Sequence, residues 1–218
     1  MVLYAATTNP GKLAEFADCA SDDGIDVRVL PNIAALPEPV EDAATFMGNA
    51  EIKAVAYSLA SPGLLVFADD SGLEIDALGG APGVRSARFA DDRGYEMNSK
   101  ATRDERNNAL VQELLEDVLV GDRTGRFVCA LALARDGKVE LRAEGKVEGH
   151  ILCAPRGENG FGYDPLFYLP EDELTMAELP PFLKWELGHR GQAFRDLLGQ
   201  LRNGDFVTTT PKTARGLR

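Results

Sequence analysis

The sequence predicts a single mixed α/β domain with two lobes around a central cleft, covering residues 1–204. Short apolar runs typical of buried strands alternate with amphipathic helical segments in the first half of the chain. In the second half, an Asp-Gly pair between two strand patterns predicts an antiparallel hairpin. No internal repeat, low-complexity tract or linker divides the sequence, which favours one mixed domain over two separate ones.

The composition limits the classes of partner. A formal net charge of −12 argues against duplex nucleic acid or an anionic membrane, because both bind clustered positive charge. Cys19, Cys129 and Cys153 are far apart and lack metal-ligand spacing, as expected for free thiols in a reducing compartment. The sequence has no secretory signal and no run of about 18 apolar residues. We therefore expect a soluble cytoplasmic protein that binds neither nucleic acid nor membrane.

The first strand is predicted over residues 2–6, and the following helix extends towards Gly24. The loop Thr7-Thr8-Asn9-Pro10-Gly11-Lys12 places Lys12 close to the N-terminus of that helix. Free backbone amides, the helix dipole and the Lys12 ammonium would all attract a phosphate there. The loop lacks the glycine spacing of a Walker A motif, and an ordinary strand-to-helix connection is the alternative.

A second strand is predicted over residues 27–30, followed by a proline-containing acidic loop with Glu38 and Glu41. Thr45 is suited to cap a helix over residues 46–60. The apolar run 64–68 is typical of a short buried strand, which would complete a β-α-β unit with a right-handed crossover.

Asp69 and Asp70 follow this run, so we expect the strand to end there with both carboxylates at its carboxyl end. Open α/β sheets bind their ligands at such ends. Adjacent side chains point in roughly opposite directions, so one carboxylate can face a cleft while the other has different partners. The residues alone leave open which carboxylate has which role. A turn at Asp-Ser-Gly is the alternative to a functional role. In either case, the alternation over residues 73–78 predicts a separate strand after Gly72.

In the second half, Thr102 and Glu105 form a capping-box pattern before an amphipathic helix. The hairpin pairs strands over residues 127–134 and 139–147. The glycine-rich loop 156–165 carries Phe161 and Tyr163, which would either stack on a planar base or pack into the core. A final helix follows His189 and Arg190, and residues 205–218 are expected to form a disordered basic tail.

Four motifs occur together in this order. They are Thr7 to Lys12, Asp69-Asp70-Ser71-Gly72-Leu73 with Gly79-Gly80-Ala81-Pro82-Gly83, Gly160-Phe161-Gly162-Tyr163-Asp164-Pro165, and Lys184 with His189-Arg190. In this combination the chain resembles the inosine triphosphate pyrophosphatase family, also called dITP/XTP pyrophosphatases, over about residues 1–204. The resemblance implies an elongated mixed sheet flanked by helices and a homodimer. It also implies Mg²⁺-dependent hydrolysis of non-standard purine nucleotides (ITP, dITP and XTP) to monophosphate and pyrophosphate.

The resemblance also implies roles for individual residues. Asp70 would be the proton acceptor and, with Glu41, a ligand of Mg²⁺, with Glu38 as the alternative to Glu41. Residues 7–12 would cradle phosphate. The remaining contacts to the nucleotide would come from Ser71, Phe161, Gly162, Tyr163, Asp164, Lys184, His189 and Arg190.

Two positions depart from the family pattern. Gly48 stands where the family usually has Glu, and Gly188 stands where it usually has Ser. The departures motivate a rival reading, a catalytically silent protein that binds nucleotide on the same fold. A pyrophosphatase that removes other modified nucleotides, including pyrimidines, is the second alternative. The preferred base, ribose against deoxyribose, the dimer interface and the purpose of the tail stay open at this stage.

Overall fold

The structure, a computed structural model, describes residues 1–9, 11–13, 16, 24–97 and 100–204. These residues form a seven-stranded sheet in the order β2-β1-β3-β4-β5-β6-β7. Its strands are β1 Val2–Ala5, β2 Asp26–Val29, β3 Val66–Ile75, β4 Thr124–Arg135, β5 Lys138–Ile151, β6 Phe167–Leu169 and β7 Leu174–Thr175. β1 is parallel to β2 and β3, and all other pairs are antiparallel. The sheet is therefore mixed, as predicted.

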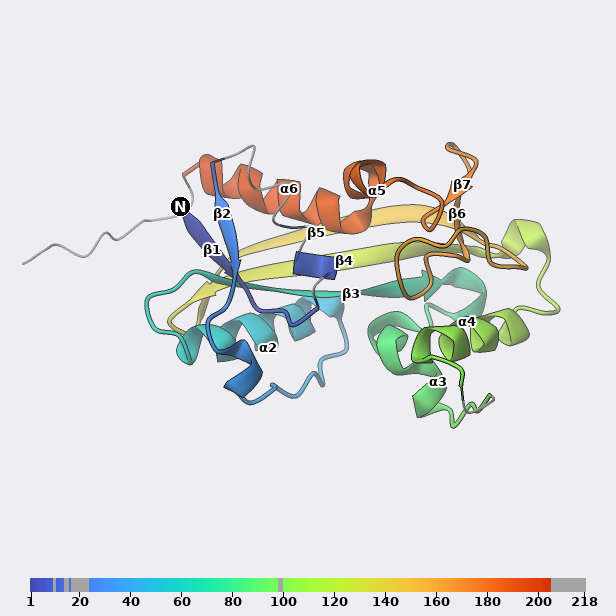
Figure 1. Ribbon diagram of the computed structural model, residues 1–218, viewed down its shortest axis with the longest axis horizontal. Helices are drawn as coiled ribbons and strands as arrows, with labels where there is room; N and C mark the ends of the chain where they lie inside the picture. Colours follow the sequence, from blue (N-terminus) through green and yellow to red (C-terminus); the bar gives the residue numbers. More distant parts are fainter. Residues whose placement is uncertain (10, 14–15, 17–23, 98–99, 205–218) are drawn as a thin grey trace, which may run out of the picture.

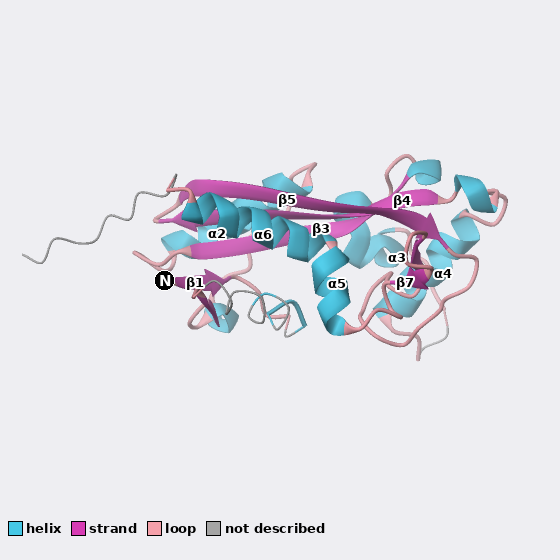
Figure 2. Cartoon of the chain, turned by 90° about the horizontal axis from the view of Figure 1, so that it is seen from above, coloured by secondary structure: helices cyan, strands magenta, loops and turns pink. Residues whose placement is uncertain are grey.

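The long strands β3, β4 and β5 run through the whole molecule and carry a group of elements at each end (Figure 1). One end holds β1, β2, α2 Phe46–Leu59 and α6 His189–Arg202. The other holds α3 Phe89–Asp92, α4 Arg103–Leu114, β6 and β7, with α5 Pro181–Leu187 between the two groups (Figure 2). The described residues also form short 3-10 helices, η2 Ile33–Ala35, η3 Asp76–Leu78, η4 Gly83–Arg88 and η5 Val120–Asp122.

The two faces of the long strands are covered by different helices. Phe67, Leu131 and Leu133 are buried against Phe194 and Leu197 of α6. On the opposite face, alanines of the strands meet Ala50 and Ala54 of α2. Small side chains on both partners let this helix approach the sheet closely. We call the face of the sheet that α6 covers the α6 face and the opposite one the α2 face. Further along the α6 face, Leu73, Ile75 and Phe127 are buried with Leu110 and Val111 of α4. The α6 face therefore lies under α6 in one lobe and under α4 in the other.

Local sequence signals account for several element boundaries. Thr45 caps α2 through a hydrogen bond from Gly48 N, and Thr102 caps α4 in the predicted capping box. The hairpin turn of β4 and β5 has positive φ at Asp136 and Gly137, as two-residue hairpin turns require. Helix α5 was not predicted; it begins at Pro181, where the N–H that proline lacks would have no partner within the helix.

Some predictions fall where the structure gives no description. Most of the first predicted helix, Pro10, Cys19 and the predicted tail 205–218 lie outside the described residues. Within the described ranges, no helix is both long enough and apolar enough to cross a membrane.

Candidate active site

Asp69 and Asp70 lie within β3 and not at its end. The strand continues to Ile75 because it pairs with β4 throughout, with Asp69 opposite Leu131 and Asp70 opposite Ala130. The prediction that charge ends the strand is wrong, as are the alternative of a turn and the separate strand over residues 73–78. The ladder tolerates both carboxylates because each has partners outside the sheet.

One edge of β3 is open beside these carboxylates. β1 pairs with β3 only at Val66 and Phe67, so no described strand covers this edge beside Asp69 and Asp70. Further along the edge, Glu74 forms an isolated bridge with Pro82. Successive side chains of a strand point to opposite faces. Asp69 accordingly lies on the face covered by α6, and Asp70 lies on the face covered by α2. A ligand at this edge would contact groups from both faces.

Asp69 is an ionised, fixed side chain. Its Oδ2 lies 2.6 Å from Nζ of Lys12, and only 4% of its side chain is exposed. Burial alone would raise the pKa of Asp69, but the charges of Lys12, Lys53 and Arg190 outweigh burial and lower it to about 2. The Asp69 carboxylate therefore holds the Lys12 ammonium in place at neutral pH.

Asp70 has different surroundings. Its Oδ2 accepts a hydrogen bond from Asn49 Nδ2 at 3.0 Å, and its Oδ1 lies 3.7 Å from Lys53 Nζ. Burial raises the pKa of Asp70, and Lys53 and Asn49 only partly offset that effect. Lys53 Nζ also lies 2.8 Å from Glu41 Oε2, so one ammonium joins the two predicted metal ligands. A raised pKa makes Asp70 the better proton acceptor of the two aspartates.

The N-terminal loop differs from the expected phosphate cradle in one respect. Asn9 Oδ1 accepts hydrogen bonds from the backbone N–H groups of Gly11 and Lys12, and Thr7 Oγ1 accepts one from Asn9 N. The amides expected to be free therefore already have acceptors in this structure. Thr8 is exposed, and the Lys12 ammonium is the strongest group that this loop offers to an anion.

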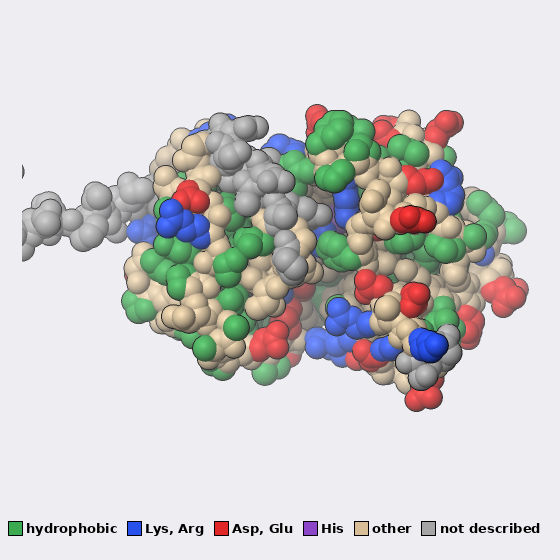
Figure 3. All heavy atoms as spheres, in the orientation of Figure 1, with side chains coloured by type: hydrophobic (Ala, Val, Ile, Leu, Met, Phe, Trp, Pro, Cys, Tyr) green, Lys and Arg blue, Asp and Glu red, His purple; other side chains and the backbone are tan. Residues whose placement is uncertain are grey.

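A cavity of about 390 Å³ lies between the two lobes on the α6 face. Figure 3 shows the molecule hollowed between its two halves, with Lys and Arg side chains in and beside the hollow. The cavity is lined by Asn9, Lys12, Ser71, Gly72, Ser86, Ala87, Arg103, Asp104, Asn107, Phe127, Phe161, Gly162, Tyr163, Asp164, His189 and Arg190. Many of the predicted contact residues, from distant parts of the sequence, thus line one space.

Phe161 is the aromatic side chain that two cations flank. The Arg190 guanidinium lies 4.9 Å and the Lys184 ammonium 5.1 Å from its ring centroid. Lys184 Nζ also lies 2.7 Å from Asp164 Oδ2, which accepts a hydrogen bond from Phe161 N at 2.9 Å. Tyr163 instead packs into the core and donates its hydroxyl to Ser86 O at 2.8 Å.

His189 is a neutral imidazole against the floor of this cavity. Its ring stacks on Phe127 with 4.9 Å between centroids, and it is 3% exposed. Burial, and then the charges of Arg190 and Lys184, hold the pKa of His189 well below its usual value. Its Nδ1 is buried without a hydrogen-bond partner in the part of the chain that the structure describes. The neighbouring Arg190 donates from Nη2 to Ser71 Oγ at 3.0 Å.

The two departures from the family pattern fit the local packing. A Cβ at Gly48 would lie 2.7 Å from Ala43 Cβ, and a Cβ at Gly188 would lie 2.3 Å from Lys184 O. Both distances are shorter than a normal van der Waals contact, so a side chain at either position would require neighbouring atoms to move from their present positions.

Several residues of the site had no predicted role. Asn49 and Lys53 are four residues apart on α2, and both reach Asp70. Their spacing places them on one face of the helix, which is the signal that could have revealed them. Asp104 and Asn107 of α4 line the cavity, but nothing in their local sequence distinguishes them from an ordinary solvated helix face.

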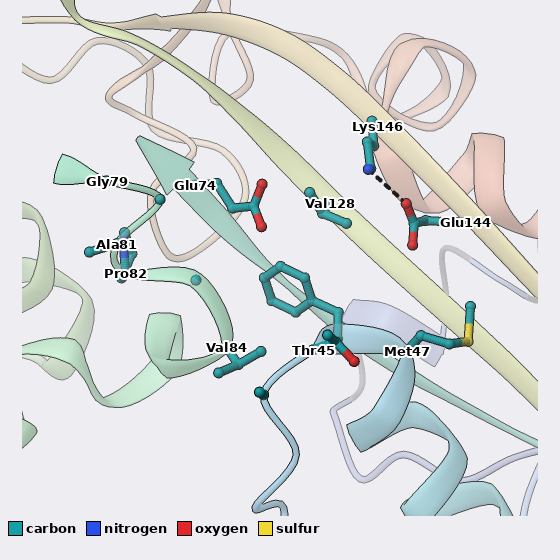
Figure 4. A pocket seen from close by; sticks show the side chains of 14 residues that line it. Thr45, Met47, Glu74, Gly79, Ala81, Pro82, Val84, Val128, Glu144 and Lys146 are labelled. Atoms are coloured by element: carbon teal, nitrogen blue, oxygen red, sulfur yellow. Dashed lines mark ion pairs between the residues drawn. The ribbon is translucent and has the colours of Figure 1, made fainter. Parts of the chain in front are cut away.

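A larger cavity of about 600 Å³ lies on the α2 face of the sheet (Figure 4). Val84, Val128 and Glu74 surround it, and the ion pair between Lys146 and Glu144 lies on the neighbouring strand β5. Asp69 and Asp70 line neither cavity, but Lys12, Arg190 and the Phe161 loop line only the smaller one. The smaller cavity therefore has the chemistry expected of the active site.

Comparison with known proteins decides the family. A family model described as the Ham1 family matches residues 3–200. The chain belongs to the Ham1 family. A relative from Acidobacterium capsulatum named dITP/XTP pyrophosphatase is 51% identical over 201 residues, which cover 92% of this chain and 98% of the relative. A relative of the same name from Geobacillus kaustophilus is 46% identical over 197 residues, which cover 89% and 91%.

Solved structures agree with this assignment to the Ham1 family. A HAM1 protein from Coxiella burnetii matches with a TM-score of 0.79 and 39% identity, covering 93% of this chain and 99% of that protein. A nucleoside-triphosphatase / dITP/XTP pyrophosphatase from Mycobacterium abscessus matches with a TM-score of 0.64 and 38% identity, covering 93% and 97%. The predicted fold class and the family resemblance are thus confirmed.

Proposed function

We propose that this chain is a nucleoside triphosphate pyrophosphatase that hydrolyses dITP, ITP and XTP to the monophosphate and pyrophosphate. The observation that carries the proposal is the open edge of β3, where the Lys12–Asp69 pair lies on one face and the Asp70, Lys53 and Glu41 cluster lies on the other. The names of its Ham1 relatives support the same activity.

The proposed reaction takes place at the phosphate groups of the substrate, and a separate part of the site binds the base. Water attacks the α-phosphorus, the bond from that phosphorus to the bridging oxygen breaks, and pyrophosphate leaves with the electron pair. Asp70 accepts the proton of the water, for which its raised pKa is suited. Lys12 binds the phosphates as a point charge that Asp69 holds in position.

The donor set near Asp70 fits a hard divalent cation. Asp70 and Glu41 supply carboxylate oxygens, and Mg²⁺ takes one or two carboxylates together with substrate phosphates and water. Among the described residues, no group of three or more His, Cys, Asp or Glu could hold a metal ion, so substrate oxygens would complete the set. Bound there, Mg²⁺ would offset the charge of the triphosphate.

The base would lie in the cavity beside Phe161. Its ring offers a stacking surface, and Arg190 and neutral His189 offer polar groups to the edge of a purine. A 6-keto purine presents an acceptor where adenine presents an amino group. A site built for the acceptor leaves a buried group unpaired against adenine, which gives strong discrimination.

The biological setting follows from the same proposal. Removal of non-standard purine nucleotides from the nucleotide pool places the protein in the cytoplasm. The resemblance supports a homodimer and a single domain over residues 1–204.

The test compares Asp70→Asn with Asp76→Asn. Asp76 follows β3 directly and pairs with Arg126 on the surface, away from the cavity, so its variant controls for charge. We expect pyrophosphate release from dITP by Asp70→Asn to fall by about 10²-fold or more, while Asp76→Asn keeps full activity. An active Asp70→Asn enzyme would refute the role of Asp70. Nucleotide binding without turnover by the unmodified protein would instead favour the silent binder.

A further inference from the structure

Side chains of one helix form hydrogen bonds with both the backbone N–H and the backbone carbonyl of Gly162. Its N–H donates to Asp104 Oδ2 at 2.8 Å, and its carbonyl oxygen accepts from Asn108 Nδ2 at 2.9 Å. Asp104 and Asn108 are four residues apart on α4, so their side chains lie on the same face of that helix. Two such contacts fix both the position and the orientation of one peptide segment.

The contact by Asn108 has a cost to the fold. Its Oδ1 is buried and has no hydrogen-bond partner among the residues that the structure describes. A buried acceptor without a partner reduces stability. Turning the amide over would place Oδ1 against the carbonyl oxygen of Gly162, so the donor must face the loop. The arrangement therefore favours the position of the loop over local stability.

The held glycine directly follows the aromatic residue of the cavity. Gly162 has φ +63°, a conformation that residues with a side chain rarely adopt. Phe161 lies just before it, with its ring near Arg190 and Lys184. On the other side the loop is held by Asp164, which pairs with Lys184 of α5. The ring of Phe161 is thus fixed between an anchor on α4 and an anchor on α5.

The α4 anchor is itself rigid. Asn107 is buried beside Asp104, accepts a hydrogen bond from Ala90 N at 2.9 Å and donates to Ser86 O at 3.2 Å. The capping box at Thr102 fixes the first turn of the same helix. Asp104 also lines the cavity, so α4 contributes to its wall together with His189 and Arg190 of α6.

We propose that Asp104 and Asn108 are positioning residues that set the Phe161 loop and thereby the affinity of the cavity for the nucleotide base. The inference rests on the proposed function, because it assigns Phe161 to the base. Both residues contact the backbone of Gly162 and not Asp70 or Lys12, so loss of either contact is expected to weaken binding of the substrate and to leave the chemical step unchanged.

The test measures KM and kcat for dITP with Asp104→Ala and Asn108→Ala. Each variant is expected to raise KM about 10-fold, while kcat stays within about 3-fold. Asp104→Asn keeps an acceptor oxygen and is expected to restore KM to within about 2-fold of the parent value. Gln112→Ala is the matched control, because Gln112 of α4 donates to Cys153 O at 2.8 Å, away from Phe161, and its loss should leave KM unchanged.

Gly162→Ala tests the same inference without changing α4. No atom lies within 4 Å of a Cβ built at Gly162, so the substitution strains φ without a clash, and KM should rise as in Asp104→Ala and Asn108→Ala. An unchanged KM in Asp104→Ala and Asn108→Ala would overturn the proposal, as would an equal rise in Gln112→Ala. The dissociation constant of dITP, measured by calorimetry on the same variants, separates the two proposals. If no variant turns over, a weakened affinity in Asp104→Ala, Asn108→Ala and Gly162→Ala, but not in Gln112→Ala, still supports the loop assignment.

Discussion

Replacing Asp69 and Asp70 separately by Asn is expected to have unequal effects on stability, although the two residues are adjacent. The Lys12 ammonium, with Lys53 and Arg190, overcomes the burial of Asp69 and lowers its pKa to about 2 from an ordinary 3.8. At about 1.4 kcal/mol per pKa unit, the ionised form contributes about 2 kcal/mol to the free energy of unfolding. Because the folded-state pKa is the lower one, this contribution is complete above about pH 4 and is lost as the pH falls towards 2. Asp69→Asn removes it at pH 7.

Asp70→Asn is expected to behave differently. Burial raises the pKa of Asp70, so the folded state favours the uncharged carboxyl. A neutral amide meets this preference but gives up one of the hydrogen bonds from Asn49 and Ser71 N. The free energy of unfolding should therefore stay within about 1 kcal/mol of the parent value or exceed it.

Urea denaturation of both variants at pH 7, followed by circular dichroism, measures the two differences. We expect Asp69→Asn to be clearly the less stable of the two. Equal losses, or a larger loss in Asp70→Asn, would refute the assignment of the two carboxylates to different surroundings. Pyrophosphate release on the same samples adds the functional contrast, since Asp70→Asn should be folded and nearly inactive.

Three further predictions concern the charged groups of the site. His189 stays neutral in the folded protein, whereas the unfolded chain protonates it below about pH 6.5, so the protein should lose about 1.4 kcal/mol of stability per pH unit below that pH. The stability of the parent relative to His189→Gln, measured from pH 7.5 to 5.5, should therefore fall by that amount. A constant difference would contradict the neutral imidazole. Lys12→Ala should raise KM for the triphosphate about 10-fold or more through the lost phosphate contact, and unchanged KM and kcat would remove Lys12 from the site. Glu41→Gln should raise the Mg²⁺ concentration needed for half-maximal activity, whereas Glu38→Gln should not, and the reverse order would exchange their roles.

The fold was predictable wherever one local signal decided the outcome. Thr45 and the Thr102 capping box located the starts of two helices, and Asp136-Gly137 located the hairpin. The end of strand β3 was not predictable, because two adjacent carboxylates followed by Ser and Gly are locally typical of a turn. Their partners Lys12 and Lys53 lie far away in the sequence, and only the tertiary structure supplies them.

The motifs of the candidate site were predictable from the sequence, but the orientations and contacts of their side chains were not. The sequence placed Phe161 and Tyr163 in one loop with equivalent roles open to both. Packing separates them, since Tyr163 is buried with its hydroxyl on Ser86 O, and Phe161 faces two cations. The contacts of Asp104 and Asn108 to Gly162 depend on the arrangement of the two segments, which no local pattern encodes.

The most direct test of the central claim is pyrophosphate release from ITP, XTP, ATP, GTP and CTP, each with and without Mg²⁺. We expect rapid Mg²⁺-dependent release from ITP and XTP and little from the other three. Equal rates with all five nucleotides would contradict the proposed reading of the base. No release from any of them, with nucleotide still bound, would contradict the enzymatic function itself.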